Sequence, residues 1–170
     1  NGQVLSTKWL SFDDLLRIKR VEEMVEVYYN SWQYALTVRL LTCIYKSAFE
    51  LFQRLGDYYD KHGLFGCSHS RPARCEILLD FLQDELKNGV ISGNADDLLA
   101  LFREALVYDL YARENCKRRP DWACDLAAYK REIRGRNPEN KGSLRHTEIF
   151  HYAFPLRDSD PINALPQRTD

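Results

Sequence analysis

Apolar residues recur every three or four positions through most of this chain, and that spacing constrains its fold more than any other feature. The first such segment follows Ser11, which can form a capping box with Asp14, and it runs to about Asn30. Its apolar stripe consists of Phe12, Leu15, Ile18, Val21, Val25 and Tyr28. Continuous alternation, the pattern of a half-buried strand, is nearly absent before Arg145. The body of the chain is therefore expected to be helical.

The same spacing predicts five further helices, at about 35–46, 47–62, 72–88, 95–114 and 120–134. Ser47 and Asn94 carry side-chain oxygens suited to capping two of these helices. Gly63 and Gly89 are suited to ending two of them. Pro120 is suited to the first turn of the last helix. Its inward-facing residues are expected to be Trp122, Leu126, Tyr129 and Ile133.

One segment near the end differs from the rest. Residues 145–154 are rich in β-branched and aromatic side chains, which predicts an extended strand. A single strand needs a partner, which could be residues 3–8, a second copy of the chain or another domain. The expected fold class is therefore mainly α, a compact bundle of about six helices with a short C-terminal β element. We expect one domain over residues 1–155 and a poorly ordered tail over residues 156–170.

Composition narrows the classes of function. The 170 residues suffice for one ordinary domain. The chain holds 24 Lys and Arg against 25 Asp and Glu, which argues against electrostatic binding of nucleic acid by the whole chain. No apolar run approaches the roughly 18 residues of a membrane span, and the first residues lack a signal-peptide pattern. Five cysteines, an odd number, are typical of reduced thiols, so we expect a cytoplasmic location.

The best candidate for a metal site or a nucleophile is Cys67 with His69, with His62 nearby. No chelating C-x-x-C pair is present and the spacing indicates no orienting acid, so idle thiols are the favoured interpretation. Glu148 and His151 form a single Glu-x-x-His element. In an extended segment, residues three apart point to opposite faces, which disfavours a shared metal. With no standard catalytic motif, no catalytic or cofactor-binding residue is assigned to this chain.

Asp109 is an acid on an apolar stripe, between Leu106 and Leu110 of the predicted 95–114 helix. A half-buried carboxylate needs a partner, and Arg113 one turn later or a neighbouring tyrosine could supply it. A structural acid is therefore favoured over a functional one.

Positive charge is concentrated in residues 113–145, which hold ten Lys or Arg against five Asp or Glu. The candidates for docking or anion contacts are Lys117, Arg118, Arg119, Arg131 and Arg134. An alternative function is a free-standing helical module that binds nucleic acid through this region. A solvated helix face or an acidic patch on a partner explains the charge equally well, and no aromatic residues are interleaved for stacking. We therefore favour those two interpretations.

The run L-L-R-I-K-R-V-E-E-M-V-E-V-Y-Y-N-S, residues 15–31, resembles the opening of a domain of unknown function, family 4080. That domain is found after the catalytic barrel of cobalamin-binding radical S-adenosylmethionine (radical SAM) proteins. Residues 49–59, the R-E-A-L-V-Y-D run at 103–109 and the late H-T-E-I-F-H-Y resemble the same family in the same order. The resemblance therefore covers most of the chain. Trp32 departs from it, because a small residue such as Gly is expected there.

This resemblance implies a bacterial multidomain parent that binds cobalamin, a 4Fe-4S cluster and S-adenosylmethionine. The cluster needs three thiolates at C-x-x-x-C-x-x-C spacing, which these cysteines lack, so no cofactor is expected on this chain. The chain is expected to be a non-catalytic accessory domain that docks on the barrel or shapes substrate access. Its expected partners are the radical SAM barrel and the cobalamin-binding domain of the same chain, with neither a membrane nor nucleic acid.

Overall fold

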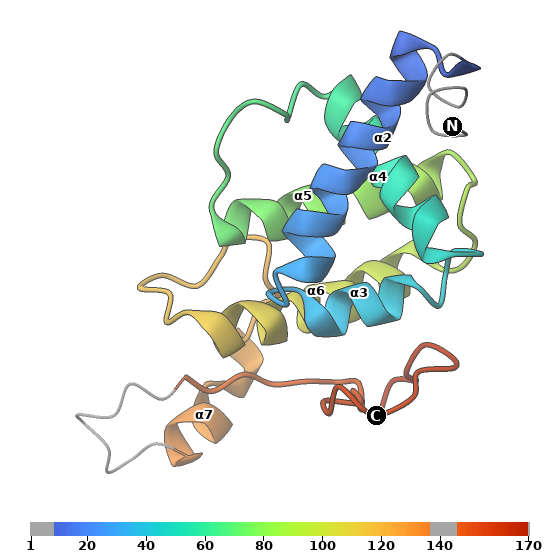
Figure 1. Cartoon of the computed structure of the whole chain (residues 1–170). Coiled ribbons are helices and arrows are strands. Elements are labelled where there is room, and N and C mark those ends of the chain that lie inside the picture. Colours follow the sequence, from blue (N-terminus) through green and yellow to red (C-terminus); the bar gives the residue numbers. More distant parts are fainter. Residues whose placement is uncertain (1–8, 137–145, 170) are drawn as a thin grey trace.

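The computed structural model describes residues 9–136 and 146–169. α-Helices make up most of these residues (Figure 1). They are α2 (Phe12–Met24), α3 (Ala35–Leu41), α4 (Ala48–Lys61), α5 (Arg71–Lys87), α6 (Ala95–Arg113) and α7 (Lys130–Arg136). A π-helical turn, η1 (Val25–Asn30), extends α2, and a 3-10 turn, η2 (Ala127–Tyr129), precedes α7. The predicted mainly helical bundle is confirmed.

Local side-chain chemistry sets several helix boundaries. The Ser11 hydroxyl accepts from the Asp14 N–H at 3.1 Å, and Asp14 accepts in return from the Ser11 N–H, which completes the predicted capping box. The side-chain oxygens of Ser47 and Asn94 each accept from one backbone N–H at the start of α4 and α6, both at 3.1 Å. Gly89 follows α5 with a φ of 72°, a conformation that disfavours residues with a Cβ. The predicted starts of these helices are therefore found within one or two residues.

Helix α6 lies at the centre of the bundle, because α3 and α5 both pack against it while α2 packs on α4. Its buried apolar side chains cover most of its circumference: Leu99, Leu101, Phe102, Ala105, Leu106, Val107 and Leu110. The α2–α4 pair is joined at its edge by ion pairs from Arg17 to Asp57 (2.7 Å) and from Arg20 to Asp60 (3.2 Å). A helix buried over most of its circumference leaves little solvent for a charged group on its buried sides, so any such group needs a partner in the core.

Two of the predicted helices are shorter than expected. Helix α3 ends at Leu41, where the spacing predicts helix to about residue 46. The chain turns after Pro120 and becomes helical only at η2. Arg119 donates to the Cys124 carbonyl oxygen across this turn and thereby holds it in a non-helical conformation. Ile133, expected to face inward, is only partly buried, since α7 has no buried residue.

The C-terminal segment, residues 146–169, runs along α6 and α3 (Figure 1). No β-strand is found in the described residues, so the expected strand is not present there. Tyr152 forms only an isolated antiparallel bridge with Arg168, and the Thr169 N–H donates to the His151 carbonyl oxygen at 2.7 Å. The segment therefore pairs with itself. Residues 3–8, one partner considered for the strand, lie outside the described residues.

Residues 156–169, where the sequence predicts a poorly ordered tail, contact α3. Arg39 donates to the carbonyl oxygens of Pro155, at 3.0 Å, and Asp160. The Cys43 thiol lies 3.5 Å from the Ile162 carbonyl oxygen. These contacts are made by backbone carbonyls, so they depend little on the identity of the tail residues.

Candidate functional site

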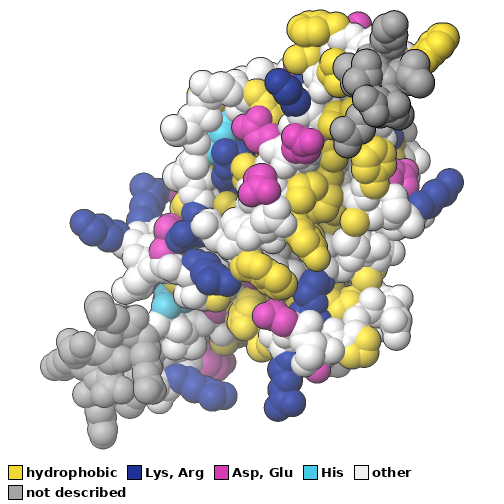
Figure 2. Space-filling view, viewed as in Figure 1, with side chains coloured by type: hydrophobic (Ala, Val, Ile, Leu, Met, Phe, Trp, Pro, Cys, Tyr) yellow, Lys and Arg dark blue, Asp and Glu magenta, His cyan; other side chains and the backbone are white. Residues whose placement is uncertain are grey.

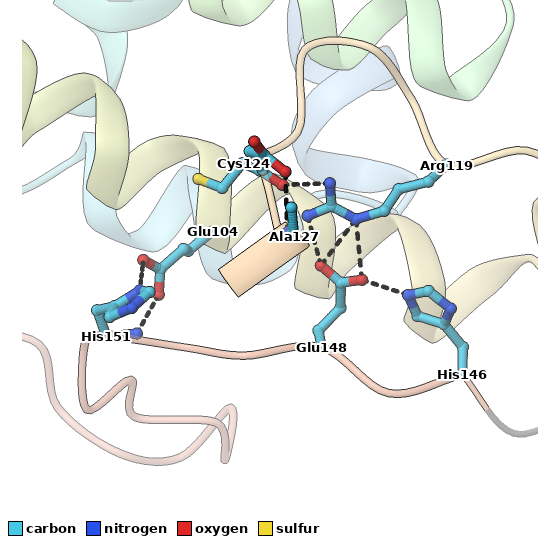
Figure 3. A network of polar contacts seen from close by, with 8 residues as sticks. Glu104, Arg119, Cys124, Ala127, His146, Glu148 and His151 are labelled. Carbon is cyan, nitrogen blue, oxygen red and sulfur yellow. Dashed lines mark hydrogen bonds and ion pairs between the residues drawn. The ribbon is translucent and has the colours of Figure 1, made fainter. Parts of the chain in front are cut away.

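The C-terminal segment is fastened to the bundle by two buried carboxylates (Figure 3). The first, Glu104 of α6, accepts from the backbone N–H of His151 at 2.5 Å and lies 3.2 Å from Nδ1 of the same residue. Nε2 of His151 lies 2.7 Å from the Tyr129 hydroxyl. A carboxylate, an imidazole and a phenol thus form one chain of hydrogen bonds between α6, the C-terminal segment and η2.

The second carboxylate belongs to Glu148, whose side chain is 7% exposed. Arg119 donates to it from Nη2 at 2.8 Å and from Nε at 3.1 Å, and Nε2 of His146 contacts it from another side. The His146 ring stacks on Tyr111 with 3.8 Å between ring centroids. A buried charge is tolerated when it is paired and hydrogen-bonded in this way. We call Glu104, Arg119, Glu148 and His151 the C-terminal network.

The geometry of this network indicates a structural role. Glu104 orients His151 as an acid orients a general base. However, the Tyr129 hydroxyl occupies the position at Nε2 where a substrate proton would be taken. Glu148 and His151, disfavoured from the sequence as joint metal ligands, bind different partners. The network therefore holds the C-terminal segment in place.

The structure brings Cys67 and His69 together, with Sγ 3.5 Å from Nε2. Nε2 of His69 also lies 2.8 Å from the Leu64 carbonyl oxygen, an acceptor that favours a proton on this nitrogen. A protonated Nε2 cannot take the thiol proton. His62 is not part of the pair, since its ring packs on Tyr58. Among the described residues, no group of three or more His, Cys, Asp or Glu could hold a metal ion.

The five basic candidates do not form one free surface. Arg119 is used by Glu148 inside the C-terminal network. Arg118 pairs with Asp121 at 3.1 Å, and both side chains are more than four-fifths exposed, at 85% and 88%. Lys117, Arg131 and Arg134 are exposed. Arg119 is therefore the one of the five that the bundle itself needs.

Asp109 lies in the core, with both carboxylate oxygens facing the start of α3. It accepts from the backbone N–H groups of Leu36 (3.1 Å) and Thr37 (2.8 Å) and from the Thr37 hydroxyl (2.7 Å). It therefore acts as an N-terminal cap supplied by another helix, and a carboxylate is favourable at this end of the helix dipole. Arg113, the partner expected from sequence, donates instead to the Trp32 carbonyl oxygen at 2.8 Å.

We expect the stability contribution of Asp109 to fall with rising pH. Burial raises the pKa of Asp109 from 3.8 to about 6, although the three donors oppose the rise. Between roughly pH 4 and pH 6, the folded protein keeps a proton that the unfolded chain has lost, so the free energy of unfolding decreases through this window. Relative to an Asp109→Asn variant, which does not titrate here, the wild type should lose about 2–3 kcal/mol across the window. Denaturant titrations of both proteins from pH 3.5 to pH 7 measure this loss. A free energy of unfolding of the wild type that rises with pH relative to that of Asp109→Asn would contradict the prediction.

The apolar stripe predicted for the first helix is only half covered. Tyr28, at its C-terminal end, is 1% exposed and packs in the core. Phe12, Leu15 and Ile18, in the first two turns of α2, are 74%, 38% and 43% exposed. The covered side of α2 is the one that faces α4, where its two arginines make ion pairs. The first turns of α2 therefore present large apolar side chains to solvent.

Two further exposed aromatic residues lie in η1 and just after it. Tyr29 and Trp32 are about half exposed, with 6.2 Å between their ring centroids. Figure 2 shows hydrophobic side chains gathered on the side of the molecule that carries α2. We call Phe12, Leu15, Ile18, Tyr29 and Trp32 the α2 apolar face. Exposed apolar residues that cluster in this way commonly mark an interaction surface.

The fold and these sites define a helical domain with a buried capping acid, a fastened C-terminal segment and an uncovered apolar face. A family model described as "Protein of unknown function (DUF4080)" matches residues 3–155. The chain therefore belongs to this family. No curated protein and no solved structure matches it. None of the described helices is long and apolar enough to cross a membrane.

The departure noted at Trp32 has a structural counterpart. Trp32 has a φ of 59°, and no other described non-glycine residue has a positive φ. This left-handed conformation favours glycine, since a Cβ crowds the backbone there. The position thus has the backbone geometry for which a small residue was expected.

Proposed function

We propose that this chain is a non-catalytic accessory domain of a bacterial, cytoplasmic radical SAM enzyme that binds cobalamin, and that it docks on the catalytic barrel or shapes substrate access. The cobalamin, the 4Fe-4S cluster and S-adenosylmethionine would be held by other domains of that parent. The observation that supports docking most directly is the α2 apolar face, whose Phe12 and Ile18 are exposed on a helix otherwise packed on α4. The stretch on which the radical SAM resemblance rests, residues 15–31, includes part of this face.

The apolar surface favours this proposal over nucleic-acid binding through residues 113–145. A nucleic-acid surface uses several free cations, and two of the five candidates are already paired, Arg119 with Glu148 and Arg118 with Asp121. Apolar and aromatic side chains, by contrast, supply most of the energy at protein–protein contacts. The catalytic barrel is therefore the partner proposed for the α2 apolar face.

Docking predicts a measurable association between this domain and the separately expressed barrel of its parent, with a Kd of tens of micromolar or tighter. A double variant, Phe12→Asp with Ile18→Asp, should weaken that association at least about tenfold, because it places two charges in an apolar contact. Sedimentation velocity with mixed components provides the measurement. Both side chains are exposed, so the variant should unfold within about 0.5 kcal/mol of the wild type.

Val90→Asp is the matched control, since it also changes an exposed apolar residue to aspartate but lies beyond the end of α5. It should leave the association unchanged. Absence of any association at tens of micromolar, or equal weakening by both changes, would contradict the proposal. Self-association of the isolated domain that the double variant abolishes would instead assign the face to a second copy of this chain.

A further inference from the structure

A surface cavity of about 450 Å³ lies between the turn that follows η1, the start of α5 and the end of α6. The residues that line it include two arginines, Arg71 and Arg74, together with Tyr34 and Glu114. This cavity is separate from the C-terminal network and contains no residue of the α2 apolar face. A ligand could therefore bind in this cavity whether or not the α2 apolar face is docked on a partner.

Tyr34 supplies the strongest indication that something binds there. Its side chain is 2% exposed, and its ring packs against Tyr28 with 5.0 Å between centroids. Its hydroxyl has no hydrogen-bond partner among the described residues. Every fully inaccessible side-chain nitrogen or oxygen in the described residues has a partner, so this hydroxyl is reached by solvent, and Tyr34 is one of the residues that line the cavity. A hydroxyl that solvent reaches and that has no protein partner is free to donate to an incoming acceptor.

Arg74 supplies the charge. Its Nη1 donates to the Tyr59 hydroxyl at 2.8 Å and its guanidinium lies 5.6 Å from the centre of that ring, both neutral contacts. No carboxylate pairs with Arg74 in the part of the chain that the structure describes. Arg71 donates to the Gln33 amide oxygen at 2.9 Å and to Glu114 at 2.8 Å. The cavity therefore has two guanidinium groups against one carboxylate.

The start of α5 adds little to this site. The Ser70 hydroxyl already accepts from the Ala73 N–H at 3.2 Å, the Arg74 N–H donates to the Ser70 carbonyl oxygen, and Pro72 has no N–H. Recognition must therefore come from side chains, from the remaining donors of Arg74 and the Tyr34 hydroxyl. A guanidinium beside a hydroxyl donor is suited to an oxyanion, because carboxylate and phosphate oxygens accept several short, charge-assisted hydrogen bonds.

We propose that this cavity binds the oxyanion group of a small ligand, a carboxylate or a phosphate, through Arg74 and the Tyr34 hydroxyl, with Arg71 contributing charge. The volume exceeds that of a single phosphate, so the cavity has room for a ligand that carries a further part. Tyr34 is the orienting donor and Arg74 the main source of affinity.

Inorganic phosphate and acetate are the two probes, each titrated at constant ionic strength while the Arg Nε–H signals are followed by NMR. The signals of Arg71 and Arg74 should shift with a saturable, millimolar Kd for at least one probe, and the Arg71 signal serves as the readout in Arg74→Gln. Tyr34→Phe should weaken that Kd about threefold to tenfold, and Arg74→Gln at least about tenfold, as expected for loss of one neutral and one charged hydrogen-bond donor. Arg118→Gln, which removes an exposed arginine elsewhere, should leave it unchanged.

Tyr34→Phe also provides a test that does not depend on the affinity of either probe. Because the wild-type hydroxyl has no protein partner, the variant should unfold at the same or a higher temperature than the wild type without any anion. Added phosphate should then raise the midpoint of thermal unfolding of the wild type more than that of the variant.

In the NMR titrations, saturation by acetate alone assigns the site to a carboxylate, and saturation by phosphate alone assigns it to a phosphate. Equal responses in wild type, Tyr34→Phe and Arg74→Gln, or no shift with either probe, would overturn the proposal.

Discussion

Asp109→Ala should lower the free energy of unfolding by about 3 kcal/mol at neutral pH, the largest effect of any polar substitution considered in this protein. The carboxylate of Asp109 accepts three hydrogen bonds at the start of α3, and its side chain is buried between α3 and α6. Alanine would leave two backbone N–H groups and a hydroxyl without acceptors in the core. Denaturant unfolding followed by circular dichroism measures the loss.

Two comparisons separate capping from a general effect of removing charge. Asp109→Asn keeps one acceptor oxygen and should lose less, about 1–2 kcal/mol. Asp121→Ala removes an 88% exposed acid paired only with Arg118, and it should stay within about 0.5 kcal/mol of the wild type. If Asp109→Ala were no more destabilising than Asp121→Ala, Asp109 would not cap α3.

The helix starts were predictable because their causes are local. Ser11, Ser47 and Asn94 each bond an N–H three residues later, so the sequence around them contains the whole interaction. Apolar spacing likewise locates α5 and α6. The end of α3 and the turns after Pro120 were not predictable, because distant contacts compete with helical propensity there: the Cys43 thiol lies near the Ile162 carbonyl oxygen, and the Trp122 ring N–H donates to the Pro72 carbonyl oxygen.

Coverage of the α2 stripe was not predictable for a different reason. Spacing places Ile18 and Val25 in one stripe, but only the packing of α2 on α4 decides which turns are covered. The partner of Asp109 was missed for the same reason, since Leu36 lies 73 residues away in sequence. What the sequence did indicate is that an acid on an apolar stripe needs a partner.

Glu104 shows where a usable signal was overlooked. It does not lie on the stripe of α6 defined by Phe102, Leu106 and Leu110, so a search along that stripe passes over it. Yet α6 carries apolar residues on every side, which marks it as a central helix. On such a helix, every acid in the middle turns is a candidate for a buried polar contact, whichever face it occupies.

Glu104→Ala should cost about 2 kcal/mol of stability and loosen the C-terminal segment. The change removes the acceptor of the His151 N–H, at 2.5 Å, and the carboxylate that faces its ring. The segment would still be held by Arg119 and Glu148, so its release should be partial. Hydrogen exchange should quicken at the amides of His151 and Thr169, the latter because it donates to the His151 carbonyl oxygen.

Glu104→Gln is the matched control for this change, since its amide oxygen can still accept from the His151 N–H, and it should lose about half as much stability. Combining Glu104→Ala with Arg119→Ala should speed exchange at Thr169 further, because each change removes one of the two carboxylate contacts of the segment. If the Thr169 amide of Glu104→Ala exchanged at the wild-type rate, the lost stability would come from α6 alone and not from a loosened C-terminal segment. The contacts of the tail with Arg39 of α3 would then be the ones that hold the segment in place.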